Sequence, residues 1–151
     1  MPRKAVKKHM YQVSKEIRAS LPFVFSWCTD YREDDTKITG SKNRRKILHR
    51  SKQYVIYLTT FKGRRHPWKA VSIVTLTPPS AWHLDFFGDH EDCRGEYRLR
   101  RVKPGLTRLS MVFNEVYKIT KAPTKAEDAE STSQLWDKYI ERLEADYRRS
   151  A

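Results

Sequence analysis

A long amphipathic stretch after Pro123 leaves the chain few ways to fold. Apolar side chains recur there at steps of three and four residues, the spacing of one helix face: Leu135, Trp136, Tyr139, Ile140, Leu143 and Tyr147. Thr124 and Glu127 have the spacing of a capping box, which predicts where this helix begins. About 23 helical residues would extend roughly 35 Å. A helix of that length needs a large apolar surface to cover its apolar face.

The residues before this helix supply such a surface, because apolar and polar side chains alternate along much of them. The alternation predicts strands at 9–18, 45–51, 53–61, 68–76, 82–87, 96–102 and 106–119, the last being the longest. Turns at 88–92 and 103–105 are short, so the strands that they join must be antiparallel. Ser20 and Pro22 predict a short helix that ends near Asp30, and residues 31–43 form a second small helix or a loop.

The chain length and composition limit the domain organisation. The 151 residues are enough for one hydrophobic core but not for two. We therefore expect a single α+β domain at residues 9–151, preceded by a basic, flexible arm at residues 1–8. No run of about 18 apolar residues exists, and the N-terminus lacks the apolar region of a secretory signal. These features predict a cytoplasmic protein in which Cys28 and Cys93 are free thiols.

Two parts of the sequence resemble a known family. Residues 13–25 (VSKEIRASLPFVF) and 29–31 (TDY) are similar to the first strand and helix of the START-like, or SRPBCC, superfamily. Residues 95–99 (GEYRL) and 104–109 (PGLTRL) are similar to its sixth strand, following turn and long last strand. The resemblance covers roughly residues 9–148. It implies a helix-grip fold, in which a curved antiparallel sheet of about seven strands wraps around the C-terminal helix, with one or two short helices after the first strand.

The resemblance also implies a function. The superfamily includes polyketide cyclases, coenzyme Q-binding proteins and the birch-pollen-allergen type, whose cavity typically holds a lipid, quinone, steroid or polyketide. A curved sheet cannot pack flush against a straight helix, so an apolar pocket between them is also expected physically. We therefore predict binding or transport of a hydrophobic small molecule. The candidate pocket residues are Trp68, Trp82, Phe86, Tyr97, Met111, Phe113, Glu115, Tyr117, Trp136, Tyr139, Ile140 and Leu143.

Glu115 is the candidate for chemistry, because it falls on the apolar face of the last strand, between Phe113 and Tyr117. A carboxylate there must be paired, protonated or directed into a cavity. A salt bridge with Arg101 is one explanation. The alternative is a cyclase- or dehydratase-type enzyme in which Glu115 or His83 acts as acid or base. No nucleophile elbow, phosphate loop or metal-ligand spacing occurs, so binding without cofactor or metal is favoured over catalysis.

The positive charge of the chain predicts a further alternative. The net charge is +13, and residues 42–69 contain ten Lys and Arg residues but no acid. A surface of one sign attracts anions, such as nucleic acid or an anionic membrane, although it can also be a merely solvated face. The candidate anion-binding residues are Lys42, Arg44, Arg45, Lys46, Arg50, Lys62, Arg64 and Arg65. The sequence predicts no oligomeric state.

Overall fold

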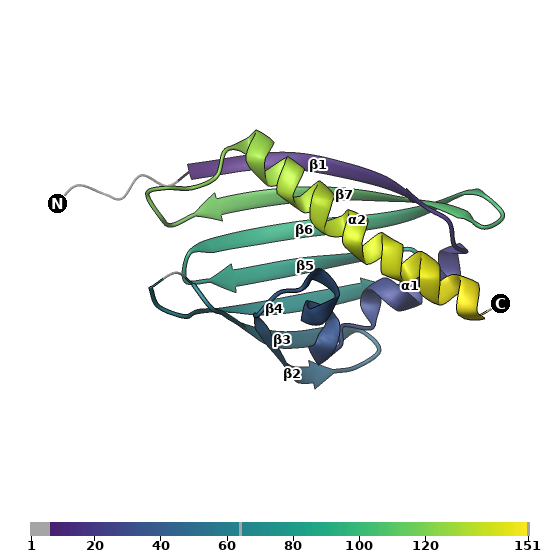
Figure 1. Cartoon of the computed structure of the whole chain (residues 1–151), viewed down its shortest axis with the longest axis horizontal. Helices are drawn as coiled ribbons and strands as arrows, with labels where there is room; N and C mark the ends of the chain where they lie inside the picture. The colour runs from purple at the N-terminus through teal and green to yellow at the C-terminus, as the bar shows by residue number, and fades with distance from the viewer. Residues whose placement is uncertain (1–6, 64, 151) are drawn as a thin grey trace.

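A computed structural model describes residues 7–63 and 65–150. The elements are β1 (Lys7–Ile17), α1 (Leu21–Thr29), the 3-10 helix η1 (Glu33–Thr39), β2 (Arg44–Arg50), β3 (Tyr54–Phe61), β4 (Trp68–Thr77), β5 (Ala81–Gly88), β6 (Glu91–Lys103), β7 (Leu106–Tyr117) and α2 (Lys125–Ser150). The strands form one curved antiparallel sheet, and α2 crosses it diagonally (Figure 1). This arrangement confirms the predicted α+β class and helix-grip fold.

The first and last strands lie side by side at one edge of the sheet, and β2 forms the other edge. The strand order is β1-β7-β6-β5-β4-β3-β2, so the first and last strands are neighbours while β2 forms the far edge. β1 pairs with β7 along its whole length, from Lys7 opposite Tyr117 to Ile17 opposite Thr107. Because successive side chains of a strand point to opposite faces, every second residue of each strand faces α2. The residues that line the space under α2 therefore come from many separate parts of the chain.

The C-terminal helix begins as the capping-box pattern predicts. Thr124 Oγ1 accepts a hydrogen bond from the Glu127 backbone N–H at 3.1 Å, and Glu127 Oε1 accepts one from the Thr124 backbone N–H at 3.0 Å. Farther along α2, Leu143 is fully buried and Ile140 is 8% exposed. Leu135, in contrast, is 39% exposed although it lies on the same apolar stripe. The last half of the stripe thus packs on the sheet, whereas its beginning at Leu135 does not.

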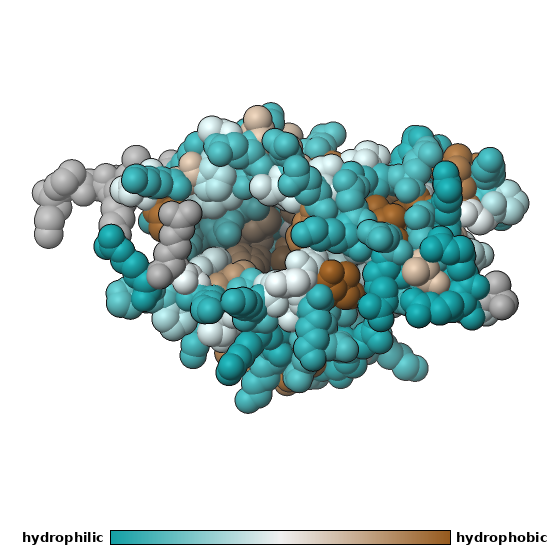
Figure 2. Space-filling model, in the orientation of Figure 1, coloured by the Kyte–Doolittle hydropathy of each residue, from teal (hydrophilic) through white to brown (hydrophobic). Residues whose placement is uncertain are grey.

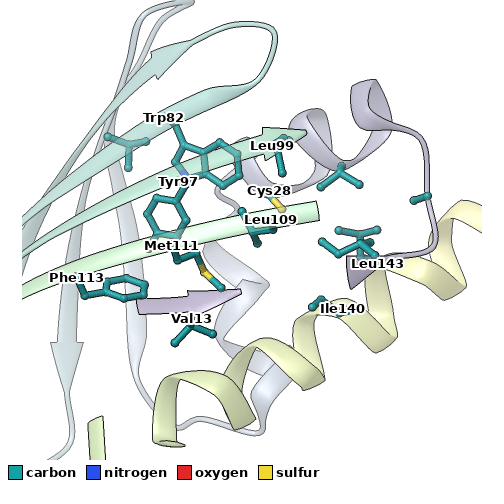
Figure 3. Close-up of a cluster of buried hydrophobic side chains, with 14 of the residues drawn as sticks. Val13, Cys28, Trp82, Tyr97, Leu99, Leu109, Met111, Phe113, Ile140 and Leu143 are labelled. Carbon is teal, nitrogen blue, oxygen red and sulfur yellow. The ribbon is translucent and has the colours of Figure 1, made fainter. Parts of the chain in front are cut away.

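The core lies beneath this packed half of α2. Figure 3 shows Ile140 and Leu143 pointing from α2 toward the sheet, where Met111 and Leu109 lie on β7. Leu109 and Leu143 are fully buried, and Met111 is 1% exposed. The core is therefore concentrated under the C-terminal part of α2, and a cavity is left under the middle of the helix.

Several boundaries differ from those predicted. β1 begins at Lys7, so the last two residues of the expected arm belong to the strand, and residues 1–6 lie outside the described residues. β6 is the longest strand, with 13 residues, because it begins at Glu91 and the turn before it contains only residues 89–90. The start of β6 resembles a turn in sequence because the residues that face inward there are Glu91 and Cys93, not large apolar residues. Residues 33–39 form a short 3-10 helix, the first of the two alternatives for this region.

Candidate functional site

A cavity lies between the sheet and the middle of α2. It consists of three adjoining hollows of about 160, 180 and 290 Å³, and Leu135 lines all of them. Figure 2 shows the cavity as an opening with hydrophobic and weakly polar walls inside a mainly hydrophilic rim. A dry cavity of about 150 Å³ is large enough for a benzene ring. The three hollows together therefore have room for a ligand of more than one ring.

Aromatic side chains form the middle of the cavity wall. Tyr97 and Trp136 both line the hollows of about 160 and 180 Å³, and their ring centres are 6.0 Å apart. Tyr139 lies 5.4 Å from Trp136 along α2. Phe86 and Phe113 complete the wall from β5 and β7. The sequence predicts all five as pocket residues, and the structure brings them together around one space.

Glu115 lies at one end of this cavity, on β7. The sheet register places it opposite Cys93 on β6 and opposite His9 on β1. It is 7% exposed, as its place in the strand pattern predicts. Its Oε1 accepts a long hydrogen bond of 3.4 Å from the Tyr11 hydroxyl, whereas its Oε2 is buried and has no partner among the described residues. The prediction of a salt bridge between Glu115 and Arg101 is wrong, because Arg101 lies opposite Thr107, at the far end of the β6–β7 pair from Glu115.

Glu91 is the second carboxyl in the same hollow. Burial and the nearby negative charge of Glu115 raise the pKa of Glu91 from its ordinary value of 4.5 to about 8. Glu91 therefore holds a proton at neutral pH, beside the carboxyl group of Glu115. Two carboxyls that share a proton are able to act as one acid and one base. Glu91 is absent from the predicted site because the sequence pattern assigns it to a turn.

A third acid, Asp128 at the start of α2, lies beside this pair. The Tyr117 hydroxyl donates to both carboxylate oxygens of Asp128 at 2.8 Å. His9 Nε2 lies 2.5 Å from Asp128 Oδ2. These contacts fix the N-terminal end of α2 on β1 and β7. They also engage the Tyr117 hydroxyl and one side of the His9 ring.

The opposite end of the cavity contains a cation, Arg45. Its side chain is only 12% exposed, and its Nη1 donates to Asp35 Oδ2 at 3.0 Å. The guanidinium carbon lies 4.4 Å from the centre of the Tyr57 ring, a cation–π contact. Tyr31 lies in the link between α1 and η1, and its ring stacks on the ring of Tyr57. Its φ of 35° is unusual for a residue with a side chain. The prediction of Arg45 on the anion-binding surface is wrong, because its place in β2 turns it inward.

Comparison with known proteins supports this description of the fold. No protein-family model matches the sequence, and no curated protein matches it. Among solved structures, the ZhuI aromatase/cyclase from Streptomyces sp. R1128 matches with a TM-score of 0.68 at 14% identity, over 95% of each chain. The chain has a START-like fold. A START superfamily protein from Mycobacterium smegmatis matches with a TM-score of 0.66 at 16% identity, over 95% of this chain and 99% of that chain.

A third solved structure also matches this fold. A protein from Thermus thermophilus has a TM-score of 0.76 at 12% identity, over 91% of this chain and 99% of that chain. At such identities the likeness concerns the fold alone, because folds of this kind carry unrelated functions. Any function of this START-like chain must therefore be argued from its own cavity.

Other predicted pocket residues do not line these hollows of the START-like domain: Trp68, Trp82, Met111, Tyr117, Ile140 and Leu143. Most of them belong to the packed core, where Trp82 lies flat on Tyr97 with 4.9 Å between ring centres. Trp68 stacks on Phe61 and His90 instead. The strand pattern distinguishes the inner face from the outer face, but not the part of the inner face that is covered by α2. That is why the sequence predicts core and cavity residues as one group.

His83, the other predicted acid or base, lies outside the cavity. It is on the outer face of β5, and its Nε2 lies 3.7 Å from Asp85 Oδ2. Its neighbours Leu84 and Phe86 face inward. The outer position follows from strand alternation, because residues 83 and 84 point to opposite faces. His83 is therefore not placed to act on a molecule in the cavity.

The other predicted anion-binding residues of the described chain are exposed: Lys42, Arg44, Lys46, Arg50, Lys62 and Arg65. Arg44 and Lys46 lie on the outer face of the edge strand β2, and Arg50 Nη2 donates to the Tyr31 carbonyl at 2.5 Å. Arg64 lies outside the described residues. The exposed cations therefore lie along β2 and in the loops at residues 42, 62 and 65, not among the residues that line the cavity.

Several cavity residues are absent from the predicted site. From the strands and α2 they include Tyr11, Tyr57, Leu84, Glu91, Cys93 and Thr132, and from α1, η1 and the link between them Trp27, Cys28, Tyr31 and Asp35. Glu91, Cys93 and Tyr97 have the period of two that marks one strand face, and this signal could have extended β6.

In the part of the chain that the structure describes, no group of three metal-ligating side chains could hold a metal ion. No helix within residues 7–63 and 65–150 is long and apolar enough to cross a membrane.

Proposed function

We propose that this protein binds a hydrophobic small molecule, such as a lipid, quinone or polyketide-like compound, in the cavity between the sheet and α2. The observation that supports this proposal is that Leu135, Trp136 and Tyr139 line an opening between α2 and the sheet. Covering apolar surface of this kind stabilises a complex by about 25 cal/mol for each Å² removed from water. The Leu135 side chain, 39% exposed on an otherwise packed stripe, is the surface that a ligand would cover.

Titration with an apolar fluorescent probe, together with native mass spectrometry of protein purified from its own host, tests this proposal. Leu84→Trp should abolish probe binding, because Leu84 lines two of the hollows and a larger side chain there fills them. Phe87→Trp is the matched control, since Phe87 is 54% exposed on the outer face of the same strand. Equal binding by both variants, or a wild-type protein that binds no probe and is always purified empty, would contradict the proposal.

A second candidate function is a cyclase- or dehydratase-type reaction in the same cavity. The observation that favours it is the carboxyl pair, in which a protonated Glu91 and the unpartnered Oε2 of Glu115 face a mainly apolar space. Replacing Glu115 by Gln should then abolish turnover of a cyclisable polyketide-like substrate while its binding persists. A rate that is unchanged in Glu115→Gln would exclude this residue as acid or base.

A further inference from the structure

Among residues 7–63 and 65–150, no Lys or Arg side chain pairs with the carboxyl groups at the acidic end of the cavity. The charges that act most strongly on Glu91 are those of Glu115 and Asp128, both acids. Glu115 Oε2 is buried without a hydrogen-bond partner in the described chain, although the whole protein carries a net charge of +13. A buried carboxylate oxygen without a donor is costly, and a ligand that donates to it removes this cost. The missing group is thus a donor, and a positive one is favoured.

Among the described residues, the groups that face the glutamate pair from neighbouring elements do not provide a positive donor. They are His9 and Tyr11 on β1, Cys93 on β6, Tyr117 on β7, and Asp128 and Thr132 on α2. The Tyr11 hydroxyl already shares a hydrogen bond of 3.0 Å with Thr132 Oγ1 and contacts only Oε1 of Glu115. Burial raises the pKa of the Cys93 thiol far above its ordinary value, so Cys93 adds no charge at neutral pH. The His9 ring is bound to Asp128 through Nε2.

We propose that this end of the cavity binds the protonated amine of an aromatic or apolar amine, an inference that rests on the proposed function. An ammonium group offers only donors, and so complements carboxylate oxygens that only accept. Tyr11 and Phe113 stack 5.1 Å apart beside the pair, and their ring faces also favour a cation. The hollow of about 180 Å³ accommodates one ring, and the adjoining hollow accommodates a second.

Such binding has a measurable proton balance. Before binding, Glu91 holds a proton at neutral pH, because burial and the charge of Glu115 raise its pKa to about 8. An ammonium ion that donates to Glu115 Oε2 places a positive charge beside Glu91 and lowers its pKa, and the proton of Glu91 then leaves to the solvent. Binding of a cationic amine at pH 7 should therefore release up to one proton, whereas an uncharged alcohol should release none.

The test compares three probes with the same two-ring body: the cation 2-(1-naphthyl)ethylamine, the uncharged 2-(1-naphthyl)ethanol and the anion 1-naphthaleneacetate. Isothermal titration calorimetry at pH 7, in two buffers of different ionisation enthalpy, gives both Kd and protons released. The amine should bind at least about tenfold more tightly than the alcohol, the difference expected of one charged hydrogen bond. Glu115→Gln should abolish this preference. Glu96→Gln, on the outer face of β6 with a side chain that is 49% exposed, should preserve it.

The outcomes separate this inference from the proposed function. Equal affinity for amine and alcohol, tighter binding of the acetate, or an amine preference that survives in both Glu115→Gln and Glu91→Gln would overturn the inference and leave the cavity a binding site. Failure of all three probes to bind would overturn the proposed function as well. The wild-type comparison needs no substitution, so a variant that does not fold leaves the test intact.

Discussion

Replacing Glu91 by Gln should stabilise the protein at neutral pH and have little effect near pH 4.5. The side chain is largely buried beside the carboxylate of Glu115, which raises the pKa of Glu91 to about 8. The folded protein therefore holds a proton that the unfolded chain releases at its ordinary pKa of 4.5. The Gln side chain is uncharged at every pH, so it has no proton to lose. The substitution thus removes the pH-dependent cost of burying a charge at this position.

The size of this effect follows from the two pKa values of Glu91. The contribution of its bound proton to stability is fully present below pH 4.5, and it is lost as the pH rises to about 8. In that interval, stability falls by about 1.4 kcal/mol per pH unit for one proton. At pH 7 the cost reaches about 3 kcal/mol, and water at the cavity mouth reduces it to ~2–3 kcal/mol. Glu91→Gln should recover this amount.

Urea denaturation of wild type and Glu91→Gln at pH 5, 6, 7 and 8 measures this directly. The difference in the free energy of unfolding should be small at pH 5 and should grow with pH. Glu96→Gln, an exposed substitution on the opposite face of the same strand, should not show this trend. A constant difference between wild type and Glu91→Gln at all four pH values would refute the shared proton, and so would a destabilised variant at pH 8.

Three further predictions concern packing, capping and charge. Leu143→Ala should lower the free energy of unfolding by about 2–5 kcal/mol, because Leu143 is fully buried between α2 and the sheet; a loss below about 1 kcal/mol would contradict this packing. Thr124→Ala should cost about 1 kcal/mol in the same assay, since it removes the cap of α2, and an unchanged stability would show that the cap is dispensable. If the exposed cations bind nucleic acid, the logarithm of the binding constant should fall linearly with that of salt concentration, and Arg44→Gln and Arg65→Gln should each reduce the slope by about 0.9; absence of binding at low salt would end this alternative.

Much of the fold is accessible from the sequence because burial leaves a local record in the order of residues. The change from a period of two to a helical period after Pro123 predicts the sheet and its covering helix. The capping box of Thr124 and Glu127 is also predictable, since both partners lie within one turn. The buried position of Glu115 follows from the same alternation. Each of these features depends on residues that are close in sequence.

The cavity is harder to predict, because its walls break the rule that inner residues are apolar. Glu91 and Cys93 face inward from β6, yet a polar start to the strand looks like a turn when it is compared with an ordinary core pattern. Met111 and Phe113 show the converse problem. They are neighbours on the inner face of β7, but Met111 is packed in the core and Phe113 lines a hollow. The position of α2 decides between them, and that position depends on packing over the whole sheet.

Charge shows why a cluster in sequence is not a cluster in space. Arg44, Arg45 and Lys46 are consecutive, but alternation along β2 turns Arg45 under the sheet toward Asp35 and leaves the other two outside. The basic stretch therefore contributes to two different environments. Composition cannot separate them, because it counts charges without assigning each residue to a face. The strand boundaries of β2 are sufficient to assign Arg45 correctly once they are known.

The cavity and the surface consequently favour ligands of opposite charge. Outside, a net charge of +13 attracts anions and repels a cationic amine over distances of up to about 8 Å at physiological salt. Inside, the nearest charges to a molecule beside Glu115 are carboxylates, and they act in a space where water screens them less. An amine would therefore be selected after entry and not during encounter. Arg45, paired with Asp35 at the other end, adds little net charge, so the glutamate pair dominates the electrostatics of the cavity.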